Sequence, residues 1–332
     1  MNRHRLIQIF AVITSIGAYA MLMLGVVVTN TGSGQGCGNS WPFCHGQLIP
    51  DSMSLSAFYE YTHRTASGVD GFLILTLTVW AWLAYRKDVR VKILAFMSLF
   101  FVVLQGALGA VTVVYEGTFA KYPLLALHFG FSLISFASVV LLTIHLFQVS
   151  KENQGPKPDL VKRGLQFAIW GVTAYTYLVV YSGALVQHTK ALMGCGTDFP
   201  GCGSTYFPSI TSTAGVQMLH RYAAASIWLL LLVLLIVVLR QSQGRRDIVV
   251  GAWCAFILVT LQAASGVMNV FSGGLAIWGG VHTTLIAALF TVLSYLCMQG
   301  GWPWAKRVQP LPQASALETS EEYQKKTSTV VS

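Results

Sequence analysis

The stretch GCGNSWPFC at residues 36–44 is matched 158 positions later by GCGTDFPGC at residues 194–202. Two glycines, one proline and both cysteines recur in the same places. Three further features recur in the same order at offsets of 154 to 157: His63-Arg64 with His220-Arg221, Leu104-Gln105 with Leu261-Gln262, and His128 with His282. Shared order at a nearly constant offset indicates an internal repeat that divides the chain into two similar halves.

The composition places both halves in a membrane. Hydrophobic residues make up 54% of the 332 residues and charged residues only 10%, whereas about a quarter of the residues in a soluble domain are charged. A spanning helix needs roughly 20 consecutive apolar residues. Eight such stretches are found, at about 6–28, 65–85, 92–114, 124–147, 165–187, 221–239, 248–271 and 281–299.

The sequence therefore predicts an all-α integral membrane protein with eight transmembrane helices in two four-helix bundles. An even number of helices in each half makes both halves start from the same side, as parallel repeats. We expect an N-terminal bundle at 1–150, a cytoplasmic linker at 151–163, a C-terminal bundle at 164–300 and a disordered polar tail at 301–332. Ala18-Tyr19-Ala20 is typical of a signal-peptide cleavage site, but the repeat requires this segment as a helix.

The basic residues are unevenly distributed about these helices. Of the 21 Lys and Arg residues, 17 fall before the first helix, in the links after even-numbered helices or in the tail. By the positive-inside rule both termini are cytoplasmic. The net charge of +9 is thus explained by the orientation of the helices in the membrane. We therefore expect no nucleic-acid partner.

Two cysteine pairs fall in loops on the non-cytoplasmic side, where disulfides persist. We interpret Cys37–Cys44 and Cys195–Cys202 as disulfides that staple these loops, each pair enclosing six residues with Gly and Pro among them. Redox exchange with a thiol carrier stays open, above all for the first pair. Zinc binding is a weaker alternative, because zinc ligands within a pair are usually more closely spaced.

Four histidines occupy repeat-related positions at the outer ends of the even-numbered helices: His63, His128, His220 and His282. Histidine inside a spanning segment is rare and usually faces the bundle interior. Within a half, the two histidines lie at similar depth on helices that run in the same direction. Two imidazoles without a carboxylate or thiolate ligand suit heme iron, so the pattern predicts two heme sites.

Other polar residues near these sites have two readings. Arg64 and Arg221 each follow a histidine, where they could pair with heme propionates or extend to the interface as isolated charges. The remaining histidines lack repeat partners and we treat them as incidental: His4, His45, His145 and His188.

One difference separates the halves. Glu60 lies three residues before His63, and the matching residue before His220 is the neutral Gln217. Residues three apart share a helix face, so Glu60 would face the first heme site. A carboxyl there can move protons or stabilise positive charge, whereas a solvated loop glutamate is the plain alternative. The asymmetry favours chemistry in the first half and electron transfer in the second.

The motifs TNTGSGQGCG at 29–38, WPFCHG at 41–46 and EYTHR at 60–64 resemble heme A synthase of the Gram-positive bacterial type. The resemblance covers residues 1 to about 300. It implies oxidation of a heme O methyl group, through an alcohol, to the formyl group of heme A. It also implies that His63 and His128 face the substrate heme, that His220 and His282 hold a permanent heme b, and that Glu60 assists the oxidation. Cys37 and Cys44 match the family's outer-loop pair.

The resemblance also implies partners. Heme O synthase supplies the substrate, and a heme-A-containing terminal oxidase or its assembly factors receive the product. The removal of four electrons from a methyl carbon needs an outside electron acceptor or oxygen, and a thiol reductant is a further candidate partner. The other partner is the lipid of the cell membrane, with the heme sites near its outer face.

Two other classes of protein would account for part of this pattern. A bis-histidine membrane cytochrome that only transfers electrons explains the histidines but leaves the Glu60/Gln217 difference unexplained. A membrane thiol–disulfide carrier explains the cysteines but not the histidines.

Overall fold

The computed structural model describes residues 3–115, 121–152, 161–242 and 244–305. Most of the predicted linker and nearly all of the predicted tail lie outside these residues. The described chain contains eight long helices and one short 3-10 helix, η1. Their bounds are α1 Arg3–Asn30, α2 Leu55–Ala84, α3 Val89–Val114, α4 Lys121–Glu152, α5 Arg163–His188, η1 Ala191–Met193, α6 Thr213–Gln241, α7 Arg246–Phe271 and α8 Ala276–Gly300.

All eight helices are long and apolar enough to cross a membrane. Within the described residues the only β-structure is two isolated bridges in the cysteine loops. The predicted all-helical fold with eight spanning helices is therefore confirmed. The chain is a multi-pass membrane protein.

Two helices begin earlier than their hydropathy predicts. α2 starts at Leu55 and α6 at Thr213, eight to ten residues ahead of the apolar stretches. Each start is fixed by a serine N-cap: Ser54 accepts a hydrogen bond from the Ala57 N–H, and Ser212 from the Gly215 N–H. The extra turns mix apolar and polar residues and end in a His-Arg pair, so they fall outside the continuous apolar stretches. They carry the Glu60 and Gln217 positions, which are consequently helical.

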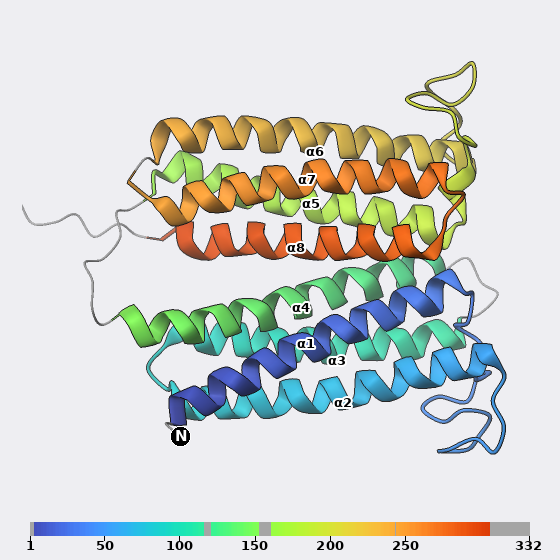
Figure 1. Cartoon of the computed structure of the whole chain (residues 1–332), viewed down its shortest axis with the longest axis horizontal. Coiled ribbons are helices and arrows are strands. Elements are labelled where there is room, and N and C mark those ends of the chain that lie inside the picture. The colour runs from blue at the N-terminus through green and yellow to red at the C-terminus, as the bar shows by residue number, and fades with distance from the viewer. Residues whose placement is uncertain (1–2, 116–120, 153–160, 243, 306–332) are drawn as a thin grey trace, which may run out of the picture. The chain divides into compact units, whose positions relative to one another are not determined.

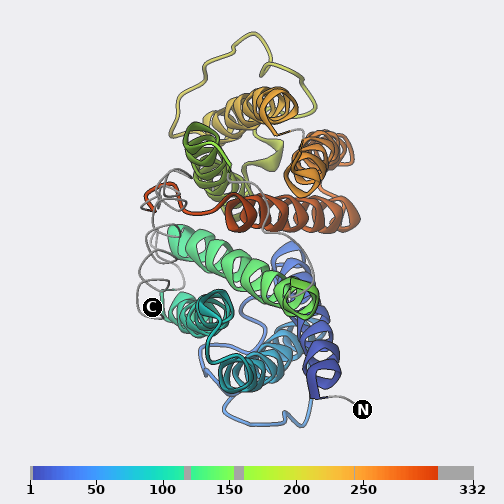
Figure 2. The same ribbon diagram turned by 90° about the vertical axis from the view of Figure 1, so that its left-hand side faces the viewer.

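The helices form two neighbouring groups, α1–α4 and α5–α8 (Figure 1). Within the first group α1 contacts α2 and α4, and α3 contacts α2 and α4. In the second group α5 contacts α6 and α8, and α7 contacts α6 and α8. The groups meet where α4 packs against α5 and α8 and where α1 packs against α8, and Figure 2 shows α4 and α8 side by side at this boundary. Tyr19 hydrogen bonds Thr284 and Gln187 donates to Asn30 across this boundary, both at 2.9 Å.

Apolar side chains fill both groups and also cover their outsides. Ile74, Leu77 and Leu142 are buried in the first group, and Leu231 and Leu293 in the second. Many large apolar side chains remain exposed along the outer helix faces. This distribution is expected where lipid rather than water surrounds the helices.

Candidate functional site

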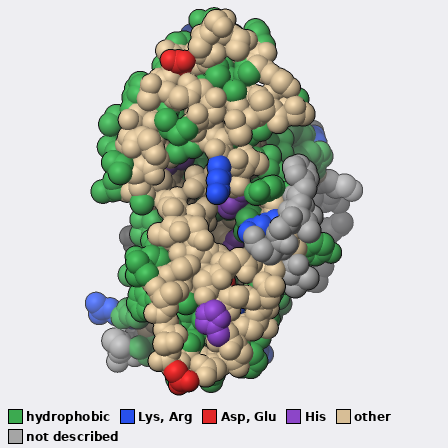
Figure 3. All heavy atoms as spheres, turned by 90° about the vertical axis from the view of Figure 1, so that its right-hand side faces the viewer, with side chains coloured by type: hydrophobic (Ala, Val, Ile, Leu, Met, Phe, Trp, Pro, Cys, Tyr) green, Lys and Arg blue, Asp and Glu red, His purple; other side chains and the backbone are tan. Residues whose placement is uncertain are grey.

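The four repeat-related histidines lie at one end of the helices, the end that carries the two cysteine loops (Figure 1). Each follows the first residue of its helix by six to eight positions. Seen from this end, the surface is hollowed near its middle, and histidine side chains are visible there beside Lys or Arg side chains (Figure 3).

Each histidine packs against a glycine on the preceding odd-numbered helix. A Cβ added to Gly183 would lie 2.8 Å from His220 Cε1, closer than real Cβ atoms approach. The other three contacts place an added Cβ 3.2–3.4 Å from the imidazole: Gly25 with His63, Gly109 with His128 and Gly266 with His282. A side chain at Gly183 would displace the ring of His220, whereas at the other three glycines an added Cβ would only press closely against the imidazole.

The spacing of these glycines in the sequence was a further signal for their contact with the histidines. Gly183 follows Gly25 by 158 residues, and Gly266 follows Gly109 by 157. These are the offsets of the repeat itself. Glycine is common in spanning helices because it lets helices approach closely, so its spacing alone does not mark a site.

Three of the imidazoles are also oriented by hydrogen bonds at Nδ1. His128 Nδ1 lies 2.7 Å from the Gln105 carbonyl oxygen. In the second half, His220 Nδ1 lies 2.9 Å from Ser182 Oγ and His282 Nδ1 lies 2.9 Å from Ser265 Oγ. His63 Nδ1 is buried without a hydrogen-bond partner. Partners at Nδ1 favour the tautomer that leaves the Nε2 lone pair for a metal.

The histidines fall into two pairs, one in each half. His63 is within electrostatic range of His128, and His220 is within range of His282. Nowhere in the described ranges do three or more His, Cys, Asp or Glu side chains form a group able to hold a metal ion. A two-imidazole site fits a metal that brings its own remaining ligands, as heme iron does.

Each cysteine pair is closed by a disulfide and docked on the first turns of a helix. The S–S distances are 2.04 Å for Cys37–Cys44 and 2.10 Å for Cys195–Cys202. The Cys37 N–H donates to Glu60 Oε2 at 2.7 Å, and the Cys195 N–H donates to Gln217 Oε1 at 2.7 Å. The two halves thus use the residue three positions before the histidine in the same way, to hold the cysteine loop.

Beyond that shared bond, Glu60 and Gln217 differ. Glu60 is only 4% exposed, and its Oε1 accepts a 2.6 Å hydrogen bond from Arg64 Nη2. Gln217 instead donates through Nε2 to the Leu192 carbonyl at 2.5 Å. The first half therefore has a buried ion pair, one turn of helix from His63, where the second half has a neutral amide.

The two arginines reach into the cysteine loops. Arg64 Nη1 donates to the Phe43 carbonyl at 2.8 Å, and Arg221 Nη1 donates to the Asp198 and Gly201 carbonyls at 2.7 Å. Arg221 Nη2 is buried without a hydrogen-bond partner. A buried guanidinium nitrogen with no acceptor is costly, and it fits an anionic group of a bound ligand.

Two of the histidines regarded as incidental have defined neighbours. His145 Nε2 lies 3.0 Å from Asp88 Oδ2, at the end of the helices opposite the cysteine loops. His188, the last residue of α5, is within electrostatic range of His128 in the other half. Sequence offsets could not reveal either contact, because neither histidine has a repeat partner.

Comparison with known proteins finds similarity along most of the chain. Residues 8–294 match the COX15-CtaA family model, described as cytochrome oxidase assembly protein. The chain is 40% identical over 295 residues to a heme A synthase of Halalkalibacterium halodurans, covering 89% of this chain and 97% of that protein. It is 40% identical to a heme A synthase of Bacillus mycoides over 89% of this chain and 94% of that protein. An Alkalihalophilus pseudofirmus heme A synthase is 39% identical, covering 89% of this chain and 97% of that protein. The chain therefore belongs to the COX15-CtaA family of cytochrome oxidase assembly proteins.

Proposed function

We propose that this protein is a heme A synthase, which oxidises the methyl group of heme O to the formyl group of heme A for a terminal oxidase. The observation that carries the proposal is the pair of glycine-cradled, two-histidine sites that differ at one acidic residue. Relatives that carry the name heme A synthase match the chain over 89% of its length. The reaction makes the protein an oxidoreductase acting on heme O.

We assign the substrate site to the N-terminal half, residues 1–150, and a permanent heme b to the C-terminal half, residues 164–300. The hydrogen bonds at the imidazoles support this division. His220 and His282 are both oriented at Nδ1 by serine hydroxyls, as suits a cofactor that stays bound. His63 has no partner at Nδ1, as suits a ligand that must release its product.

The residues would divide the chemistry as follows. Bound heme iron supplies the electron transfer that no side chain can perform. His63 and His128 hold the substrate, and Glu60 takes the proton released or stabilises positive charge at the reacting carbon. Its position supports this role, because Arg64 holds the buried carboxyl in place one turn of helix before His63.

Propionate binding is proposed for Arg64 and Arg221. The free Nη2 of Arg221 supports it, and bidentate contact with a carboxylate suits arginine. Arg64 would bind a propionate only by sharing or exchanging its bond to Glu60.

The cysteine loops would have related but unequal roles. Cys195–Cys202 serves as a staple. Cys37–Cys44 is the candidate for exchange with a thiol reductant, since the Cys37 N–H bonds directly to Glu60.

Both loops and both heme sites would lie near the outer face, with the termini cytoplasmic, as the distribution of Lys and Arg favours. Heme O synthase and the terminal oxidase or its assembly factors are the proposed partners.

Extraction of heme from the purified protein tests the proposal. Heme O or heme A together with heme B is the expected result. Heme B alone would indicate an electron-transfer cytochrome instead, and absence of heme would indicate a thiol–disulfide carrier.

A further inference from the structure

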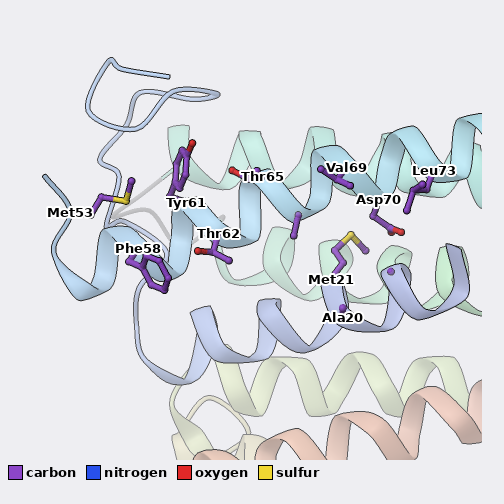
Figure 4. Close-up of a pocket in the computed structure, with 12 residues that line it drawn as sticks. Ala20, Met21, Met53, Phe58, Tyr61, Thr62, Thr65, Val69, Asp70 and Leu73 are labelled. Atoms are coloured by element: carbon purple, nitrogen blue, oxygen red, sulfur yellow. The ribbon is translucent and has the colours of Figure 1, made fainter. Parts of the chain in front are cut away.

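A cavity of about 450 Å³ lies along the seam between α1 and α2 (Figure 4). We call it the α1–α2 groove. Its rim includes the exposed side chains of Phe58, Thr65 and Val69, and its floor includes the buried Met21 and Asp70. The groove thus opens on the outside of the helices and deepens toward the seam. A volume of this size holds a small apolar ligand.

Asp70 is the unexpected residue in this lining. Its side chain points toward α1 (Figure 4), and the residue is only 2% exposed. Neither carboxyl oxygen has a hydrogen-bond partner. A carboxyl within a spanning helix is expensive and usually functional. An unpartnered pair of oxygens in an apolar groove points to a ligand that supplies a hydrogen-bond donor.

The groove is aligned with the proposed substrate site. Gly25 of α1 contacts His63, and two turns along the same seam Gly17 contacts Asp70, where an added Cβ would lie 2.8 Å from Oδ1. His63 and Asp70 are seven residues apart on α2, which is about 10 Å along a helix axis. A ligand bound at His63 therefore has to extend about 10 Å along the seam to reach the level of Asp70, which is beyond the edge of the porphyrin ring and calls for a substituent on that ring.

The second half closes the equivalent space. At the repeat offsets, Tyr175 replaces Gly17 and Ile227 replaces Asp70. Ile227 is buried in the core of that half with Tyr175 packed against the same cluster, and the Tyr175 hydroxyl bonds Ser226 at 2.7 Å. Side chains therefore fill this space in the half assigned to heme b, whereas the space is open in the half assigned to the substrate.

We propose that the α1–α2 groove receives the isoprenoid side chain of heme O, and that Asp70 accepts a hydrogen bond from the hydroxyl at the base of that chain. The inference rests on the proposed function and names the part of the substrate that this site recognises. Heme O differs from heme B by this hydroxylated chain, which lies on the side of the ring away from the propionates. With the propionates near Arg64, the chain points inward along the seam toward Asp70. Gly17 and Asp70 then distinguish heme O from heme B.

Binding titrations test the proposal. Heme O and, separately, heme B are added to the full-length protein in lipid nanodiscs with its second site filled by heme B, and the Soret difference spectrum is recorded. Asp70→Ile, which installs the second-half residue, should weaken heme O binding by about tenfold or more while changing heme B binding by less than about twofold. Asp70→Asn keeps an acceptor and should retain most of the affinity. Ile227→Val on α6 is the matched control and should change neither affinity.

The midpoint of thermal unfolding distinguishes a loss of ligand binding from a folding defect. Without heme O, Asp70→Ile should raise the midpoint of thermal unfolding, because it removes a buried carboxyl that has no partner. Equal losses of heme O and heme B affinity in Asp70→Ile, or no loss of either, would overturn the inference. The proposed function would still stand if His63→Ala abolished heme O binding. Failure of the unaltered protein to bind heme O would overturn both.

Discussion

At the scale of single residues, each of the four imidazoles packs against a glycine on a neighbouring helix. Gly183 gives the tightest of these contacts, with an added Cβ 2.8 Å from His220 Cε1. The imidazole also bonds Ser182, so it cannot move away without losing its orientation. The glycine and the serine together fix the position and the orientation of this imidazole.

Gly183→Ala should therefore lower heme B content. Displacement of an oriented metal ligand typically weakens metal binding by about 10- to 100-fold. Gly171→Ala on the same helix is the control, because a Cβ there meets nothing within 4 Å. The pyridine hemochrome spectrum of purified protein measures the difference. Equal heme B in the two variants would show that the glycine contact does not set the ligand.

Glu60→Gln reproduces the second-half residue in the first half. The amide oxygen can still accept from the Cys37 N–H, as Gln217 does from Cys195, so the loop and the heme content should persist. The charge beside Arg64 is lost. Heme A formation should fall on the order of a hundredfold, the contribution of a positioned acid or base. Heme A yield is measured by chromatography of extracted hemes, and an unchanged yield would exclude a chemical role for Glu60.

At the scale of elements, the link between α2 and α3 is organised by Asp88. Its Oδ1 accepts from the N–H groups of Arg90 and Val91 at the start of α3, and its Oδ2 faces His145 on α4. Burial alone would raise the pKa of Asp88, but the Val91 hydrogen bond and the His145 contact more than offset it, and the pKa lies below its ordinary value of 3.8. The ionised form is thus favoured by the folded state.

This shift gives a pH dependence of stability. A group whose pKa is lower in the folded state stabilises the fold above its unfolded pKa, and that stability is lost as pH falls through the folded pKa. Asp88→Asn keeps an N-cap but does not titrate. The unaltered protein should exceed Asp88→Asn in thermal midpoint near neutral pH, and the difference should shrink as the pH falls below about 3.8, through the lower pKa of the folded state. A difference that is constant across this range would contradict the assignment.

The elements also show what hydropathy can and cannot predict. The eight apolar stretches correctly predicted eight spanning helices. They missed the first two turns of α2 and α6, because those turns mix apolar and polar residues and their starts are fixed by the N-caps Ser54 and Ser212. The Glu60 position lies in such a turn.

At the scale of the whole molecule, the offset between the halves predicted which residues to compare but not what they touch. It identified Glu60 and Gln217 as different, and the shared hydrogen bonds to Cys37 and Cys195 became known only from the structure. Asp70 is an acid inside a predicted spanning stretch, which is unusual in itself, but the sequence does not reveal whether its side chain faces lipid, a neighbour or a groove. Side-chain direction depends on how helices pack, which composition does not determine.

The two halves have a common plan and, on our account, opposite uses. One holds an exchangeable substrate between His63 and His128, and the other a permanent cofactor between His220 and His282. The groove at Gly17 and the closed space at Tyr175 follow the same division. The central claim is thus that equivalent histidines in the two halves hold different hemes.

The most direct test is the heme content of His63→Ala and His220→Ala, measured side by side on purified protein. We predict that His220→Ala loses heme B, whereas His63→Ala retains heme B and loses heme O and heme A. Loss of heme B from both variants, or from His63→Ala alone, would contradict the account.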